Sequence, residues 1–149
     1  MSILVDTNLL LYAALPTSPH HADSRRWLAG AFADRTTIVC LTWPALYAFV
    51  RLITNRRIVG DAAIDMQGAW AAADAYRRQT NARMVGPGEH HSTIAAALIS
   101  TPGLSSNDVP DVQLAATAIE HGLELCTHDH GFARFPALRW SNPLASPPR

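Results

Sequence analysis

The sequence contains no lysine and only two cysteines among its 149 residues. Cys40 and Cys126 form no CxxC pair, so neither a disulfide framework nor a cysteine-based metal site is indicated. Both are expected to be small buried side chains in a reducing compartment. Charged residues are also scarce, at 16%, while apolar residues reach 48%. This balance favours helices with extensive apolar faces, or an interface between subunits.

Long hydrophobic runs are missing as well. No apolar stretch approaches the roughly 18 residues of a membrane-spanning helix, and Asp6 interrupts the first one without a basic segment before it. We therefore expect a cytoplasmic protein with no membrane partner. The formal net charge of zero argues against a broad cationic surface for nucleic acid, but leaves room for a local arginine cluster.

Short apolar runs alternate with helical patterns along the chain, which predicts an α/β protein with a parallel sheet. Thr42, followed by Pro44, is a plausible start for one helix, and Gly122 suits the end of another. Strands are expected at residues 3–5, 37–41, 83–85 and 123–127. Helices are expected to residue 15 and over residues 20–34, 42–55, 61–78, 89–100 and about 112–121.

Three aspartates from distant segments follow predicted strands or begin a helix. Asp6 ends the first strand, Asp111 lies in the first turn of a helix, and Asp129 follows the last strand. Ligands of parallel sheets bind beyond the carboxyl ends of the strands, so the three can converge. Like charges about 4 Å apart repel by roughly 4 kcal/mol at an effective dielectric near 20. Such a cluster would take up protons or recruit a cation, and carboxylates favour Mg²⁺ or Mn²⁺.

Structural alternatives stay open for these residues. Asp108 and Asp111 fit a helix cap followed by an acid near the positive end of the helix dipole, and Asp129 fits a turn. For Asp6 neither a cap nor a turn is evident in the sequence. The histidines lack the spacing of a zinc finger or an HExxH motif, so we expect surface or hydrogen-bonding roles for them. Six of the seven occur as pairs, at positions 20 and 21, 90 and 91, and 128 and 130.

Three segments carry a family resemblance: residues 5–10 (VDTNLL), 110–116 (PDVQLAA) and 127–135 (THDHGFARF). Together they resemble PIN domains, specifically toxins of the VapC type. Residues 21–28, 41–55 and 138–144 match as well. The resemblance implies a single PIN-like domain over residues 1–145, with a central parallel sheet of four to five strands flanked by helices on both sides. Residues 146–149 are expected to be a loose tail.

The resemblance also implies an activity: a Mg²⁺- or Mn²⁺-dependent endoribonuclease, the toxin of a type II toxin-antitoxin system, neutralised by a VapB antitoxin. It assigns Asp6, Asp111 and Asp129 as catalytic, metal-binding acids. Asn8 and Thr127 become supporting polar groups, and Asp108 is a weaker candidate ligand. One position departs from the pattern, because Ala48 stands where the family usually has a glutamate, which bears on whether one or two metals bind.

Other predictions concern surfaces. Arg51, Arg56 and Arg57 could guide the RNA backbone, or simply form a solvated basic helix end. Apolar residues on the helices at 42–55 and 61–78 suggest a homodimer interface and an antitoxin site, although they could equally pack inside the monomer. Two alternative functions are a catalytically weakened binding module and a metal-dependent phosphatase. The phosphatase lacks its Asp-x-Asp pattern, because Thr7 and Asn8 follow Asp6.

Overall fold

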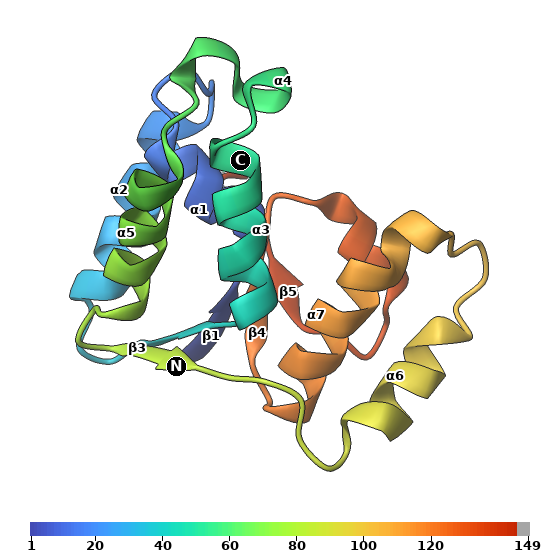
Figure 1. Cartoon of the computed structure of the whole chain (residues 1–149). Coiled ribbons are helices and arrows are strands. Elements are labelled where there is room, and N and C mark those ends of the chain that lie inside the picture. Colours follow the sequence, from blue (N-terminus) through green and yellow to red (C-terminus); the bar gives the residue numbers. More distant parts are fainter. Residues whose placement is uncertain (146–149) are drawn as a thin grey trace.

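The computed structural model describes residues 1–145, and its centre is a five-stranded parallel sheet in the order β3-β2-β1-β4-β5 (Figure 1). This confirms the predicted α/β class. The strands are β1 (Ser2–Val5), β2 (Ile38–Leu41), β3 (Ala82–Met84), β4 (Glu124–Cys126) and β5 (Trp140–Ser141). The α-helices are α1 (Thr7–Ala14), α2 (His21–Ala33), α3 (Trp43–Ile53), α4 (Arg56–Val59), α5 (Met66–Arg77), α6 (His91–Ile99) and α7 (Val109–Glu120). Short 3-10 helices are η1 (Gly60–Ala62), η2 (Ser106–Asp108) and η3 (His130–Arg134).

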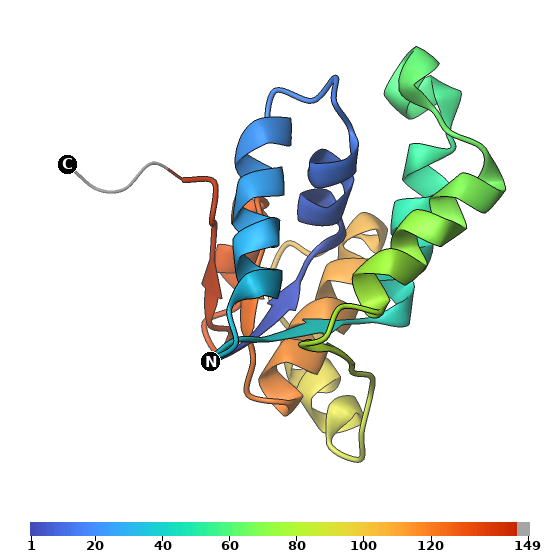
Figure 2. The same cartoon turned by 90° about the vertical axis from the view of Figure 1, so that its left-hand side faces the viewer.

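Helices cover both faces of the sheet, because successive strand residues point to opposite sides. Ile3 and Val5 of β1 belong to a core with α1, α2, α3 and α5. Leu4 and Leu125 belong to a second core with α6 and α7. Figure 2 shows the sheet between these two groups of helices. Cys40 and Cys126 are free and buried, one in each core, as predicted.

Local signals placed several element ends correctly. The Thr42 hydroxyl accepts a 3.2 Å hydrogen bond from the Ala45 amide and caps α3, which has Pro44 in its first turn. Gly122 adopts a positive φ of 65° directly after His121, the C-cap of α7. Its freedom at this angle lets the next amide, of Leu123, donate to the Ala118 carbonyl at 2.8 Å and close the helix.

One predicted helix begins elsewhere, and one strand was not located from the sequence. The helix expected from residue 61 begins at Met66, because the Asp65 carboxylate accepts from the Gly68 amide at 2.7 Å and caps α5 there. Asp61 instead lies in η1 and pairs with Arg56 at 2.8 Å. The sequence pattern also does not predict β5, which is only two residues long. The predicted tail, residues 146–149, lies outside the described residues.

The carboxyl ends of β1, β2 and β4 meet at one edge, because these strands are adjacent and parallel. Asp6, Thr42 and Thr127 are the residues that directly follow these three strands. The Asp6 amide extends the sheet by donating to the Cys126 carbonyl at 3.0 Å. The sheet therefore places Asp6 beside the carboxyl end of β4. No helix within residues 1–145 has the length and apolar character needed to cross a membrane.

Candidate active site

Asp6 joins β1 to α1 and has two partners. One carboxylate oxygen accepts a 2.7 Å hydrogen bond from the Thr7 amide, so Asp6 is the N-cap of α1. The other accepts a 2.7 Å hydrogen bond from the Thr127 hydroxyl. The expectation that no cap would involve Asp6 was therefore wrong, because α1 starts without any intervening loop. The cap alone leaves one oxygen free, and Thr127 supplies its donor.

Thr127 is the centre of a hydrogen-bond network. Its side chain is fully buried, and its hydroxyl accepts from the Asp129 amide at 3.0 Å and from the Asn8 side-chain amide at 3.3 Å while donating to Asp6. The Asn8 carbonyl oxygen accepts from the His128 amide at 3.4 Å. One donor and two acceptor positions exhaust the capacity of a hydroxyl. Thr127 and Asn8 thus hold Asp6 and the Asp129 segment in a fixed relation.

The three predicted acids interact electrostatically. The pKa of Asp6 is raised to about 6, mainly by burial; the hydrogen bonds from Thr127 and Thr7 lower it, and the charges of Asp111 and Asp129 raise it. Burial also raises the pKa of Asp111, with the charge of Asp129 as the next contribution. Asp6 therefore lies within the field of Asp111 and Asp129, and Asp111 within that of Asp129, which is the behaviour expected of acids that recruit a cation.

Arg134 is a cation inside this cluster that the sequence analysis did not assign. It comes from η3, and its guanidinium lies 2.9 Å from the Asp111 carboxylate and 3.2 Å from that of Asp108. It also lies 5.0 Å from the centre of the Phe135 ring. Its only signal in the sequence is its place five residues after Asp129, within the segment HDHGFARF.

Asp108 and Asp129 also accept hydrogen bonds from backbone amides close to them in the sequence. Asp108 stands at the N-cap position of α7, but its side chain does not cap that helix. Its carboxylate instead accepts from the Ser105 amide at 2.8 Å, which is the main cause of its lowered pKa. The capping alternative for Asp108 was therefore wrong for α7. Asp129 is exposed and caps η3 through the Gly131 amide at 2.8 Å, as its turn alternative predicted.

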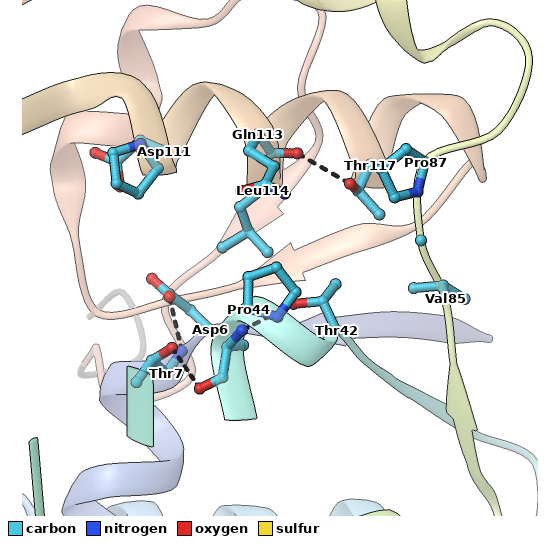
Figure 3. A pocket seen from close by; sticks show the side chains of 13 residues that line it. Asp6, Thr7, Thr42, Pro44, Val85, Pro87, Asp111, Gln113, Leu114 and Thr117 are labelled. Carbon is cyan, nitrogen blue, oxygen red and sulfur yellow. Dashed lines mark hydrogen bonds between the residues drawn. The ribbon is translucent and has the colours of Figure 1, made fainter. Parts of the chain in front are cut away.

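A cavity of about 90 Å³ opens beside the cluster, and Asp6 and Asp111 lie at one end of it (Figure 3). Leu114 and Pro44 contribute apolar walls from α7 and α3. The full lining comprises Asp6, Thr7, Thr42, Pro44, Ala45, Val85, Gly86, Pro87, Pro110, Asp111, Gln113, Leu114 and Thr117. Asp129 and Asp108 lie outside this lining.

Not every predicted residue joins the site. Arg51, Arg56 and Arg57 are exposed at the far end of α3 and in α4, whereas the cavity adjoins the first turn of α3. An 11-residue helix spans about 16 Å. Ala48 lies one turn beyond Pro44 on α3 and offers no ligand atom. Within residues 1–145, no three His, Cys, Asp or Glu side chains already stand in a group that could hold a metal ion.

Comparison with known proteins identifies the family of the chain. A family model described as "PIN domain" matches residues 3–138. The chain belongs to the PIN-domain family. It is 40% identical over 149 residues to "Ribonuclease VapC37" of Mycobacterium tuberculosis, covering 95% of this chain and 97% of that protein. It is 37% identical over 142 residues to "Ribonuclease VapC33" of the same species, covering 95% and 98%. The resemblance to VapC ribonucleases is therefore confirmed.

Solved structures share the PIN fold at low sequence identity. VapBC2 from Rickettsia felis, bound to a DNA fragment from its promoter, aligns with a TM-score of 0.70 at 15% identity, covering 95% of this chain and 98% of that chain. VapC20 from Mycobacterium tuberculosis, a toxin that cleaves the sarcin-ricin loop, aligns with a TM-score of 0.64 at 20% identity, covering 88% and 92%. These matches show that the chain shares the fold of these proteins over most of its length.

Proposed function

We propose that this PIN-domain protein is the toxin of a type II toxin-antitoxin system and acts as a Mg²⁺- or Mn²⁺-dependent endoribonuclease. One observation carries the proposal: Asp6 and Asp111, from distant segments, line one cavity at the carboxyl edge of the sheet, and the charges of Asp111 and Asp129 both raise the pKa of Asp6. The relatives named VapC ribonucleases supply the reaction class. Cleavage of RNA within the cytoplasm is the proposed activity.

Asp6, Asp111 and Asp129 would hold the ion, with Asp108 as a weaker candidate. Their chemistry fits, because an all-carboxylate set suits Mg²⁺ or Mn²⁺ and the repulsion among the acids is relieved by a divalent charge. When bound, the ion supplies Lewis-acid polarisation of a phosphoryl oxygen and an activated water. Since the acids do not stand in a preformed metal group, binding would have to draw the carboxylates together.

The chain's own residues prepare this centre. Thr127 directs one oxygen of Asp6 by its hydrogen bond, and Asp6 must lose its proton, which its raised pKa of about 6 permits at neutral pH. The single positive charge of Arg134 offsets one of the two negative charges of Asp111 and Asp108. The negative charge left for a cation is therefore smaller than four acids would give. Because Ala48 adds no carboxylate, we propose a single divalent ion.

The test is cleavage of total cellular RNA by the purified protein, with Mg²⁺, Mn²⁺ or EDTA, and with the cut ends read by sequencing. The wild type should produce discrete cuts only with metal, and Asp6→Ala should produce none. Asp23→Ala is the matched control, because Asp23 is an exposed acid on α2 that pairs with Arg26 and, among residues 1–145, with no other cation. Discrete cuts by folded Asp6→Ala would refute the proposal.

A catalytically weakened binding module is the second candidate, and Ala48 favours it because the usual acid is absent there. This module would bind RNA without metal and would leave it intact. Binding without cleavage by a folded, metal-supplied wild type would select this alternative. The phosphatase alternative is tested by adding small phosphate esters under the same metal conditions. If they are not hydrolysed, this alternative is contradicted.

We also propose a VapB-type antitoxin and a second copy of the chain as partners. The support is an aromatic patch, defined as Trp43, Tyr47, Met66 and Trp70 on α3 and α5, each at least 41% exposed. The Trp43 and Trp70 rings stack at 6.4 Å, and Tyr47 lies 5.6 Å from Trp70. Exposed contiguous apolar surface of this kind marks protein interfaces. Arg51, Arg56 and Arg57 remain proposed contacts for the RNA backbone.

A further inference from the structure

Aromatic and imidazole rings from separate segments form a continuous track beside the acids. Tyr12 of α1 lies 5.0 Å from His20 and 5.8 Å from His128, measured between ring centres. His20 and His128 lie 4.3 Å apart. The row continues through His130, at 6.5 Å from His128, to Trp140, at 5.9 Å from His130. We call these five residues the ring track.

The ring track is held in place but not covered. His128 is fixed by a side-chain contact of 3.2 Å with Asn142 and by its amide, which donates to Asn8. Tyr12, His20, His128 and Trp140 are half-buried, and His130 is exposed. Within residues 1–145 the His20 ring forms no hydrogen bond. These rings therefore present partly open surface on a rigid support.

The track borders the proposed cleavage centre. Asp129 stands between His128 and His130 in the sequence, and its amide is bound to Thr127. The pKa of the Tyr12 phenol is raised by burial and then by the charges of Asp6 and Asp129. The phenol thus lies within the field of both carboxylates. A nucleotide whose phosphate reached the acids would pass this row of rings.

Electrostatic attraction contributes little to RNA affinity beside the ring track. The net charge of the chain is zero, the site is acidic, and Arg134 is already paired with Asp108 and Asp111. Without a bound ion, the carboxylates themselves repel a phosphate backbone. Attraction through counterion release, which dominates most nucleic-acid binding, is therefore weak at this edge. Contact with the bases must contribute instead.

We propose that the ring track is a subsite that stacks unpaired bases of the RNA strand next to the phosphate being cut. Single-stranded RNA is commonly held by bases that stack on aromatic and histidine rings, and every base has a face that can stack. The inference rests on the proposed ribonuclease function, since it names how that site holds its substrate. It places His20 and Tyr12 among the RNA contacts, although neither is an acid of the centre.

The test measures binding without cleavage. In an Asp6→Asn background, fluorescence anisotropy follows a labelled oligoadenylate of about 12 nucleotides and an abasic ribose-phosphate strand of equal length. Adding His20→Ala should weaken oligoadenylate binding by about five-fold to 150-fold, the loss expected for one stacked base. Binding of the abasic strand should not change. His20→Phe should restore affinity, because it keeps a ring without a hydrogen bond or charge.

His90→Ala is the matched control, since the exposed His90 ring contacts Glu89 and lies outside the ring track. It should bind both strands like the parent. Three results overturn the subsite: His20→Ala binding oligoadenylate as the parent does, His20→Phe losing as much as His20→Ala, or a parent with no preference for oligoadenylate over the abasic strand. Failure of the cleavage assay would refute the ribonuclease alone, because base stacking is read here without any cut.

Discussion

The hydroxyl of Thr127 donates a 2.7 Å hydrogen bond to the Asp6 carboxylate, across 121 positions of the sequence. The parallel pairing of β1 with β4 makes this contact possible, since each residue directly follows one of these strands. The bond favours the ionised form of Asp6 and opposes the effect of burial on its pKa. Thr127 therefore sets how readily the site becomes charged enough to bind a cation.

Thr127→Val should raise the pKa of Asp6 above about 6, because the substitution keeps the shape of the side chain but removes the donor. Mn²⁺ affinity should then fall more at pH 6 than at pH 8, as measured by titration calorimetry. The buried groups left without partners should also lower the free energy of unfolding by about 1–3 kcal/mol. Thr127→Ser keeps the hydroxyl and should retain the normal pH profile. If Thr127→Val and the wild type showed the same pH dependence of Mn²⁺ affinity, the hydrogen bond would not control the pKa of Asp6.

Asp6→Asn should stabilise the metal-free protein at pH 7. The folded pKa of Asp6 is raised from 3.8 to about 6, so the folded state keeps its proton to higher pH than the unfolded state. The unfolding free energy of the wild type therefore falls, through this group, as pH rises from about 4 to 6, by up to about 3 kcal/mol. Asparagine carries no charge and still caps a helix. Urea unfolding in EDTA across this pH range measures the free energy of unfolding of both proteins. The difference between the two values should grow as the pH rises and then become constant.

The control for that experiment is Asp23→Asn, which changes an exposed acid on α2. Its stability should follow the wild type at every pH. If Asp6→Asn were less stable than the wild type at pH 7, the carboxylate would be a net stabilising group. The raised pKa of Asp6 would then be wrong.

Arg134→Gln should destabilise the metal-free protein by about 1–2 kcal/mol, because it leaves the facing carboxylates of Asp108 and Asp111 without their cation. A saturating divalent ion should recover part of this loss by supplying positive charge and by binding the folded state. Arg26→Gln, which breaks an exposed pair with Asp23, should cost no more than about 0.5 kcal/mol. Thermal melts with EDTA and with Mn²⁺ compare the stabilities of the two variants. Equal losses of stability would show that Arg134 does not stabilise the acid cluster.

Tyr47→Glu should dissociate the proposed homodimer, because it places a charge in the exposed aromatic patch. Tyr47 is 61% exposed, so the folded monomer should tolerate the change. Sedimentation velocity at about 10 µM should give a dimer for the wild type and a monomer for the variant. Ile99→Glu is the control, since Ile99 is 59% exposed on α6, away from the patch. A monomeric wild type would contradict the dimer.

Much of this fold was predictable because its signals are local. Apolar runs marked β1, β2 and β4, and residues such as Thr42 and Gly122 marked helix ends through their own backbone contacts. The order of acids after strands then followed from the geometry of parallel sheets. The two-residue β5 carries no such pattern, because it gains its strand geometry only by pairing with β4.

The site was predictable in its acids but not in their partners. Arg134 meets Asp111 across 23 positions, and the Tyr12 ring meets His128 across more than a hundred. Such contacts depend on how η3 and α1 pack, which no local pattern records. The cap formed by Asp6 was also not predicted, although it is a local contact. The reason is that α1 follows β1 directly, so no turn residues mark the start of the helix.

The central claim is that Asp6, Asp111 and Asp129 together hold one divalent ion. Mn²⁺ titration calorimetry at pH 7.5 on the wild type and on each single Asp→Asn variant tests it, with circular dichroism to establish folding and Asp23→Asn as control. The wild type and control should bind one ion with equal affinity, and each of the three variants should bind at least about ten-fold more weakly, a difference of about 1.4 kcal/mol. A folded variant of any of the three that binds Mn²⁺ as tightly as the wild type would contradict the claim.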